Sequence, residues 1–172
     1  ALQHAAGDVR QLAFNMLAQG IGAEQLTQFI SALNDALTRR ILELNLEQHS
    51  FDGIEWAWLA FGSEGRDEQT FSTDQDNGIV YTVPEGQTAE ALKQRFLAFA
   101  RAVNEDLDRC GFPLCKGNIM ASNPQWCLTL DEWKEQFATW VRIPDPDALL
   151  NATIFFDFRP LFGDAHLTEI MR

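Results

Sequence analysis

The stretch that decides the fold reads Gly62-Ser63-Glu64-Gly65-Arg66-Asp67-Glu68-Gln69-Thr70-Phe71-Ser72-Thr73-Asp74-Gln75-Asp76-Asn77. A dense apolar run at 56–61 precedes it and predicts a strand that leads into a glycine-containing loop and a helical turn. A second strand is predicted from about residue 76 to residue 83, where Pro84-Glu85-Gly86 ends it. The stretch therefore joins two short strands through a polar loop.

Helical periodicity dominates the regions on either side of this stretch. Apolar residues recur at helical spacing over about 9–48 and are interrupted at Gly20 and Gly22, which predicts an antiparallel helical pair and an N-terminal helical arm over 1–50. Further helices are expected from an N-cap at Thr88 to about residue 109, and over about 130–141. Residues 111–125 read as a loop. The β-branched and aromatic segment 152–158 predicts a strand.

The composition limits the class of protein. The chain has 172 residues, of which 46% are hydrophobic, and it carries a net charge of −12. This length can bury a core, the apolar content is too high for a disordered chain, and the charges interrupt any membrane span. The start carries no secretion signal, so we expect a cytoplasmic protein, and the last residues look like a helix that is cut short in a longer polypeptide. Three cysteines at irregular spacing are expected to be buried or semi-buried free thiols.

Asp74 and Asp76 are the first candidate site residues. Side chains alternate along a strand, so these two carboxylates point to the same side and repel each other. A divalent cation would keep both ionised, and oxygen ligands suit Mg²⁺, with Mn²⁺ as an alternative. Taken alone, such an acidic pair is more often a solvated strand end.

The glycine loop upstream is a candidate phosphate holder. The glycines allow close approach of the backbone, and the Ser63 hydroxyl and amides at a helix N-terminus can bind phosphate oxygens. A phosphate holder that faces a metal holder is the arrangement that phosphoryl transfer needs.

These residues resemble a known family. Gly62-Ser63-x-Gly65-Arg66 followed by Asp74-x-Asp76 is similar to the signature of the polymerase beta nucleotidyltransferase superfamily. The whole stretch resembles bacterial nucleotidyltransferases joined to CBS domains, which are relatives of the protein-PII uridylyltransferase catalytic domain. The resemblance covers most of the chain from about residue 50 onward and implies an α+β fold, with a small mixed sheet of four or five strands flanked by helices over 51–172.

The resemblance implies a role for each part of the site. Gly62, Ser63, Gly65 and Arg66 would hold the triphosphate of a nucleoside triphosphate, and Asp74 and Asp76 would bind Mg²⁺. A third carboxylate from a later strand usually completes the metal site and helps to deprotonate the acceptor, and Asp157 is the candidate. The alternative for Asp157 is an internal ion pair with Arg159 or Arg66. Lys116 is a candidate nucleotide or acceptor contact, or else a solvated loop lysine.

Two functions remain open at this point. The first is a magnesium-dependent transfer of a nucleoside monophosphate to a hydroxyl acceptor, either a tyrosine on a partner protein, as in a uridylyltransferase-like reaction, or a small hydroxyl compound. The second is a non-catalytic nucleotide-binding module that serves attached regulatory domains. A helical interaction domain is a third and weaker reading. The acidic chain disfavours a nucleic-acid acceptor, a following helical domain is expected to help grip the substrates, and the helical arm is a candidate homodimer contact.

Overall fold

The computed structural model describes residues 1–62, 74–143 and 145–172. Two long helices, α1 (Leu2–Ala18) and α2 (Ala23–Leu46), lead into β1 (Trp56–Ala60) and β2 (Asn77–Tyr81). Helix α4 (Ala89–Arg109), a short 3-10 turn (Pro124–Trp126) and β3 (Cys127–Thr129) follow. The chain ends with α5 (Leu130–Arg142), α6 (Pro146–Phe155), β4 (Arg159–Gly163) and α7 (His166–Met171).

The strands form one mixed sheet in the order β3-β2-β1-β4. β1 pairs antiparallel with both β2 and β4, and β2 pairs parallel with β3. Ala60 at the end of β1 lies opposite Asn77 on one side and Arg159 on the other. The end of β1 and the starts of β2 and β4 therefore meet at one edge of the sheet.

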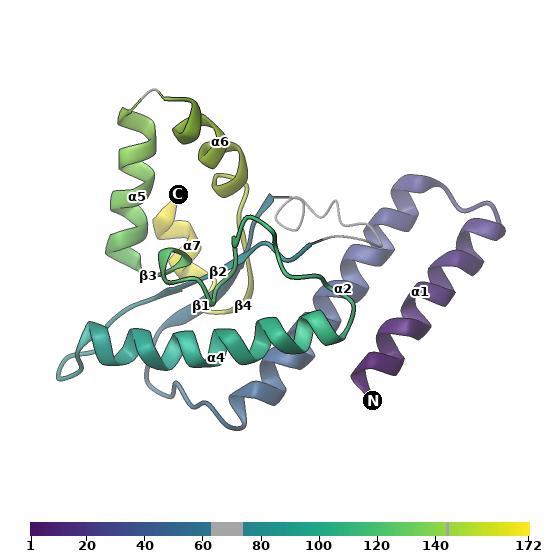
Figure 1. Ribbon diagram of the computed structural model, residues 1–172, viewed down its shortest axis with the longest axis horizontal. Coiled ribbons are helices and arrows are strands. Elements are labelled where there is room, and N and C mark those ends of the chain that lie inside the picture. The colour runs from purple at the N-terminus through teal and green to yellow at the C-terminus, as the bar shows by residue number, and fades with distance from the viewer. Residues whose placement is uncertain (63–73, 144) are drawn as a thin grey trace.

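Helices cover both faces of the sheet (Figure 1). Trp58 and Ile79 project toward α2 and α4 and share a hydrophobic cluster with Phe96 and Phe99. Leu59 and Val80, on the opposite face, share a second cluster with Trp133 of α5 and Phe155 of α6. This three-layer arrangement confirms the expected α+β fold with a small mixed sheet.

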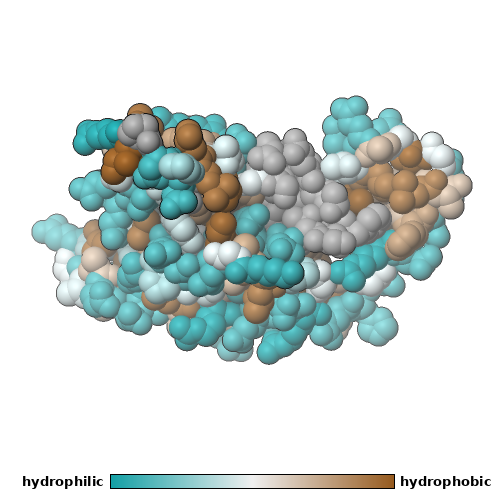
Figure 2. All heavy atoms as spheres, turned by 45° about the horizontal axis from the view of Figure 1, so that its top comes forward, coloured by the Kyte–Doolittle hydropathy of each residue, from teal (hydrophilic) through white to brown (hydrophobic). Residues whose placement is uncertain are grey.

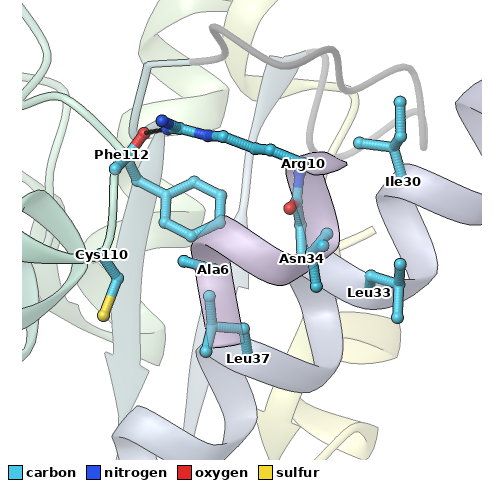
Figure 3. A pocket seen from close by; sticks show the side chains of 10 residues that line it. Ala6, Arg10, Ile30, Leu33, Asn34, Leu37, Cys110 and Phe112 are labelled. Carbon is cyan, nitrogen blue, oxygen red and sulfur yellow. Dashed lines mark hydrogen bonds between the residues drawn. The ribbon is translucent and has the colours of Figure 1, made fainter. Parts of the chain in front are cut away.

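The helical arm packs against the rest of the molecule. Ala6 of α1 and Ile41 and Leu42 of α2 belong to the same cluster as the sheet residues of that face. Figure 3 shows the junction, where the Arg10 guanidinium reaches over the end of α4 and donates to the carbonyl oxygen of Gly111 at 2.7 Å. The cavity left there has a volume of about 20 Å³, which holds one water molecule and no nucleotide. A domain boundary at residue 50 stays a prediction.

Several predicted elements are confirmed. The helical pair is present and begins earlier than expected, at Leu2. Thr88 caps α4 by accepting from the Ala91 amide, and Thr129 caps α5 within a capping box. Cys110 and Cys127 are buried and Cys115 is half-buried, all three as free thiols.

One predicted strand is wrong. Residues 152–155 form the last turn of α6, and 156–157 form a bend before β4. Asp145 caps this helix by accepting from the Ala148 amide at 2.8 Å, and Pro146 occupies its first turn. These start signals outweigh the strand preference of the β-branched and aromatic residues. The helix also buries the Phe155 side chain completely, against Phe61 and Trp140. Asp157 therefore does not lie within a strand.

Two further features concern the surface. Figure 2 shows hydrophobic side chains gathered at opposite ends of the molecule, over α1 and over α5 and α6. The exposed residues at these ends include Leu12, Leu17, Val141 and Leu149. No helix among the described residues is long and apolar enough to cross a membrane.

Candidate active site

Asp76 lies against the end of β1. The amide of Phe61 donates to the carbonyl oxygen of Asp76 at 3.0 Å, which continues the β1–β2 pairing past Ala60. Gly62 follows with a φ of +56°, in the left-handed region that favours glycine, and a Cβ atom there would lie 3.5 Å from Oδ2 of Asp76. The backbone of the glycine loop thus begins beside the Asp76 carboxylate.

Burial perturbs this carboxyl group. Asp76 is half-buried, and burial is the main cause that raises its pKa from 3.8 to about 6. The Cys115 thiol, which donates to Oδ1 at 3.4 Å, opposes the shift, and the nearby negative charge of Asp74 adds to it. Asp74 itself is exposed. The two acids are thus close enough to interact, as expected from their alternate positions.

Lys116 lies on a turn beside this pair. The amide of Asn118 donates to the carbonyl oxygen of Cys115 at 3.0 Å and closes the turn, and Asn118 adopts a φ of +55°. Lys116 is exposed next to Cys115, whose thiol contacts Asp76. The structure therefore brings the Lys116 turn to the acidic segment, whereas the contact that Lys116 makes with a ligand stays a prediction.

Asp157 lies in the bend before β4, and not within a strand as the sequence predicted. It is exposed in the bend two residues before Arg159, and Arg159 lies opposite Ala60 of β1. Arg159 donates to Oδ1 of Asp35 at 2.8 Å, and this largely buried ion pair ties the start of β4 to α2. Sheet register thus places the start of β4 at the edge that carries Gly62 and Asp76, and Asp157 precedes β4 by two residues without lying in a strand.

Ser63, Gly65 and Arg66 lie outside the described residues. Within the described residues, no group of three or more histidine, cysteine or carboxylate side chains is arranged to hold a metal ion. The metal site that the sequence predicts stays a prediction.

Gly78 leaves room for the Phe61 ring and the 3-10 turn beside the start of β2. A Cβ atom at this position would lie 2.7 Å from the Phe61 ring and 2.9 Å from the carbonyl oxygen of Trp126. Only glycine fits between them. Gly78 therefore allows Phe61, next to Gly62, to pack over the start of β2.

Comparison with known protein families identifies the family of this chain. A family model described as "Putative nucleotidyltransferase DUF294" matches residues 7–147, which is most of the chain. The chain belongs to this nucleotidyltransferase family. A comparison with curated proteins gives no match.

The match of this nucleotidyltransferase family spans both the helical arm and the sheet up to α6. It therefore contains the glycine loop, the Asp74 and Asp76 pair and the Lys116 turn, and it ends before Asp157. Nucleotidyl transfer is accordingly the general activity of the family.

Sequence reasoning missed two residues near the site and the contact that a third residue makes with Asp76. Asn77 and Asn104 were not singled out, and Cys115 was expected only to be a buried or semi-buried free thiol. One signal was available for Asn104, because it occupies a position in the apolar stripe of α4 between Ala100 and Leu107, where a polar residue must find buried partners. No sequence signal joins Cys115 to Asp76, since the two are far apart in the chain.

Proposed function

We propose that this chain is a magnesium-dependent nucleotidyltransferase that moves a nucleoside monophosphate from a nucleoside triphosphate to a hydroxyl acceptor. The observation that carries the proposal is the Asp76 carboxylate, half-buried against Gly62 with its pKa raised to about 6, beside Asp74 and within a nucleotidyltransferase family. A buried carboxylate with a like charge beside it is stabilised by a cation. A surface acid would have no such requirement.

The residues present fit Mg²⁺ as far as the donor set goes. Asp74 and Asp76 would hold the ion through carboxylate oxygens, with water and phosphate oxygens as the remaining ligands, and Mn²⁺ would be accepted in the same way. When bound, the ion would neutralise negative charge on the triphosphate. Gly62, Ser63, Gly65, Arg66 and Lys116 are proposed to bind and orient the phosphate groups.

The reaction itself exchanges one phosphorus–oxygen bond for another. The acceptor hydroxyl oxygen bonds to the α-phosphorus, the bond from that phosphorus to the oxygen bridging to the β-phosphate breaks, and pyrophosphate leaves. Asp157, in the bend before β4, is proposed to take the hydroxyl proton. A protein hydroxyl, as in a uridylyltransferase-like reaction, is the acceptor that suits an acidic chain better than a nucleic acid does.

One observation favours a second function. Asp157 lies in an exposed bend and not within a strand of the sheet. A module that binds a nucleotide for attached regulatory domains, without turnover, would require only the phosphate loop and the acidic pair. Turnover, rather than binding, separates the two candidates.

The proposal is tested by titrating each of the four nucleoside triphosphates into the protein by calorimetry, with and without Mg²⁺. We expect metal-dependent binding of one or more triphosphates in the wild type and at least a tenfold weakening in Asp76→Asn, which preserves shape and removes the charge. Asp108→Asn, an exposed acid on α4, is the matched control and should bind like the wild type.

Pyrophosphate release in the presence of candidate acceptor proteins then distinguishes the two functions. Release that Asp157→Asn abolishes, with triphosphate binding retained, supports the transferase. Binding without release under any condition supports the regulatory module. Absence of metal-dependent binding at millimolar triphosphate would refute both.

A further inference from the structure

The acidic segment has a second, buried side. Asp74 is exposed and the Asp76 carboxylate lies beside Gly62, whereas the intervening Gln75 and the following Asn77 are turned into the protein. Gln75 is 1% exposed and Asn77 is 2% exposed. Both side chains face α4, where a third buried amide, Asn104, is also 2% exposed.

Asn104 is the centre of a hydrogen-bond network between these amides. Its Nδ2 donates to Oε1 of Gln75 at 2.8 Å and to Oδ1 of Asn77 at 3.0 Å. Gln75 returns a bond from Nε2 to the backbone carbonyl of Asn104 at 3.0 Å. The Asn104 side chain on α4 is therefore hydrogen-bonded to both Gln75 and Asn77, the buried neighbours of Asp76.

The same network holds the loop that carries Lys116. Gln75 anchors the start of this loop. Its side-chain Nε2 donates to the carbonyl oxygen of Phe112 at 2.9 Å, and its backbone amide donates to the carbonyl oxygen of Pro113 at 3.1 Å. The far end is anchored by bonds that join Asn77 to Ile119 and Ala121 and by a bond from the Ser122 amide to Oδ1 of Asn104 at 3.1 Å. Cys115 and Lys116 lie between the two anchors.

We propose that Asn104 is a positioning residue, which fixes the Asp74 and Asp76 carboxylates and the Lys116 turn relative to one another through Gln75 and Asn77. The metal-binding part of this inference rests on the proposed function. The positioning part rests only on the contacts. Asn104 touches no reacting group and acts through the residues that it binds.

The burial of the three amides is what makes the arrangement rigid. A buried amide that loses its partner keeps its desolvation cost, so each alternative orientation of Gln75 or Asn77 is disfavoured unless it restores the same bonds. Partners that orient metal ligands from behind commonly change metal affinity or activity by about 10–100-fold when they are removed. We therefore expect an effect of that size from the loss of the Asn104 side-chain amide.

The test compares Asn104→Ala with Val103→Ala in the full chain. Val103 is the neighbouring residue on α4, fully buried in the core and without a part in the network, so its truncation destabilises the helix without removing these bonds. Asn77→Ala is a second, independent variant, which removes one arm of the network and leaves the bond between Asn104 and Gln75. It keeps the test valid should Asn104→Ala fail to fold.

The first measurement needs no metal. Amide hydrogen exchange is followed by NMR at Gln75 and Asn77, whose amides bond to Pro113 and Ile119. We expect exchange at both to be at least about tenfold faster in Asn104→Ala than in Val103→Ala, with exchange in β1 alike in the two variants. Equal exchange in the two variants would overturn the positioning role.

The second measurement is Mn²⁺ affinity, determined from the electron paramagnetic resonance signal of the free ion, with Asp76→Asn as the baseline. We expect Asn104→Ala to bind Mn²⁺ at least about tenfold more weakly than Val103→Ala, which should match the wild type. If Asn104→Ala and Val103→Ala bind equally, the inference fails although the proposed function stands. If the wild type binds no Mn²⁺, the proposed metal site fails, and hydrogen exchange alone decides the positioning role.

Discussion

Asp76→Asn should stabilise the metal-free protein near neutral pH. Burial against Gly62 raises the pKa of Asp76 from 3.8 to about 6, so the folded state binds this proton more tightly than the unfolded state does. As the pH rises from below 4 to above 6, the unfolded state loses its proton first, and the ionised group then destabilises the fold. Asparagine has no charge to bury.

The size of the effect follows from the same values. At about 1.4 kcal/mol for each tenfold change in proton affinity, the full difference would be about 3 kcal/mol. Asp76 is only half-buried and solvent screens its charge, so we expect about 1–1.5 kcal/mol in favour of Asp76→Asn at pH 7.5. At pH 4, where Asp76 is protonated in the fold, the difference should shrink to a few tenths of a kcal/mol.

Urea denaturation of both proteins at pH 4 and pH 7.5, with a chelator present, measures this difference. Comparing variant with wild type at each pH cancels the contributions of all other titrating groups. A variant that is no more stable than the wild type at pH 7.5 would refute the reasoning, because it would mean that Asp76 is not strained by burial. Addition of Mg²⁺ should then narrow the gap at pH 7.5 by stabilising only the wild type.

Three further substitutions test the packing that supports the site, each by urea denaturation. Gly78→Ala should cost about 2–3 kcal/mol, because its Cβ atom would lie 2.7 Å from the Phe61 ring, and an unchanged midpoint would show that the strands can separate. Asp145→Ala should cost about 1 kcal/mol through loss of the cap of α6, and no loss would mean that the helix start does not depend on it. Asp35→Asn should cost about 2 kcal/mol by weakening the ion pair with Arg159, whereas a neutral result would assign the anchoring of β4 to its other contacts with α2, among them the bond from Arg39 to the Leu161 carbonyl oxygen.

Gly7→Ala is a control for Gly78→Ala, because it should raise the free energy of unfolding where Gly78→Ala lowers it. Gly7 lies in α1, and a Cβ atom there would have nothing within 4 Å. The change should stabilise the protein by about 0.5–1 kcal/mol, because alanine restricts the unfolded chain without strain in the fold. A loss of stability here would indicate that the α1 surface is less open than described.

The elements that could be predicted from the sequence are those with strong local signals. The apolar run at 56–61 and the strand after Asp76 stand next to glycine and proline breaks, and α4 and α5 begin at threonine caps that the structure confirms. β3 was missed because a three-residue strand is too short for periodicity to be read. Its existence depends on pairing with β2, which is a tertiary event.

The error over 152–158 shows where local composition misleads. Asp145-Pro146 is a helix start signal, but it follows Pro144 closely and was read as part of the end of α5. Phe155 then favours a strand by composition, although it is buried from a helix. The role of Asp157 at the site stays a prediction, because Asp157 precedes β4 by two residues instead of lying within a strand.

The division of the acidic segment into two sides explains why amides occupy its buried positions. A carboxylate at position 75 or 77 would be less than 3% exposed, and the amide network described above would offer it no positive charge. It could also accept hydrogen bonds but not donate them. Gln75 must do both, because its Nε2 serves two carbonyl oxygens while its Oε1 accepts from Asn104. Neutral amides on the inner side therefore leave the charge of the segment to Asp74 and Asp76, on the side where a cation would bind.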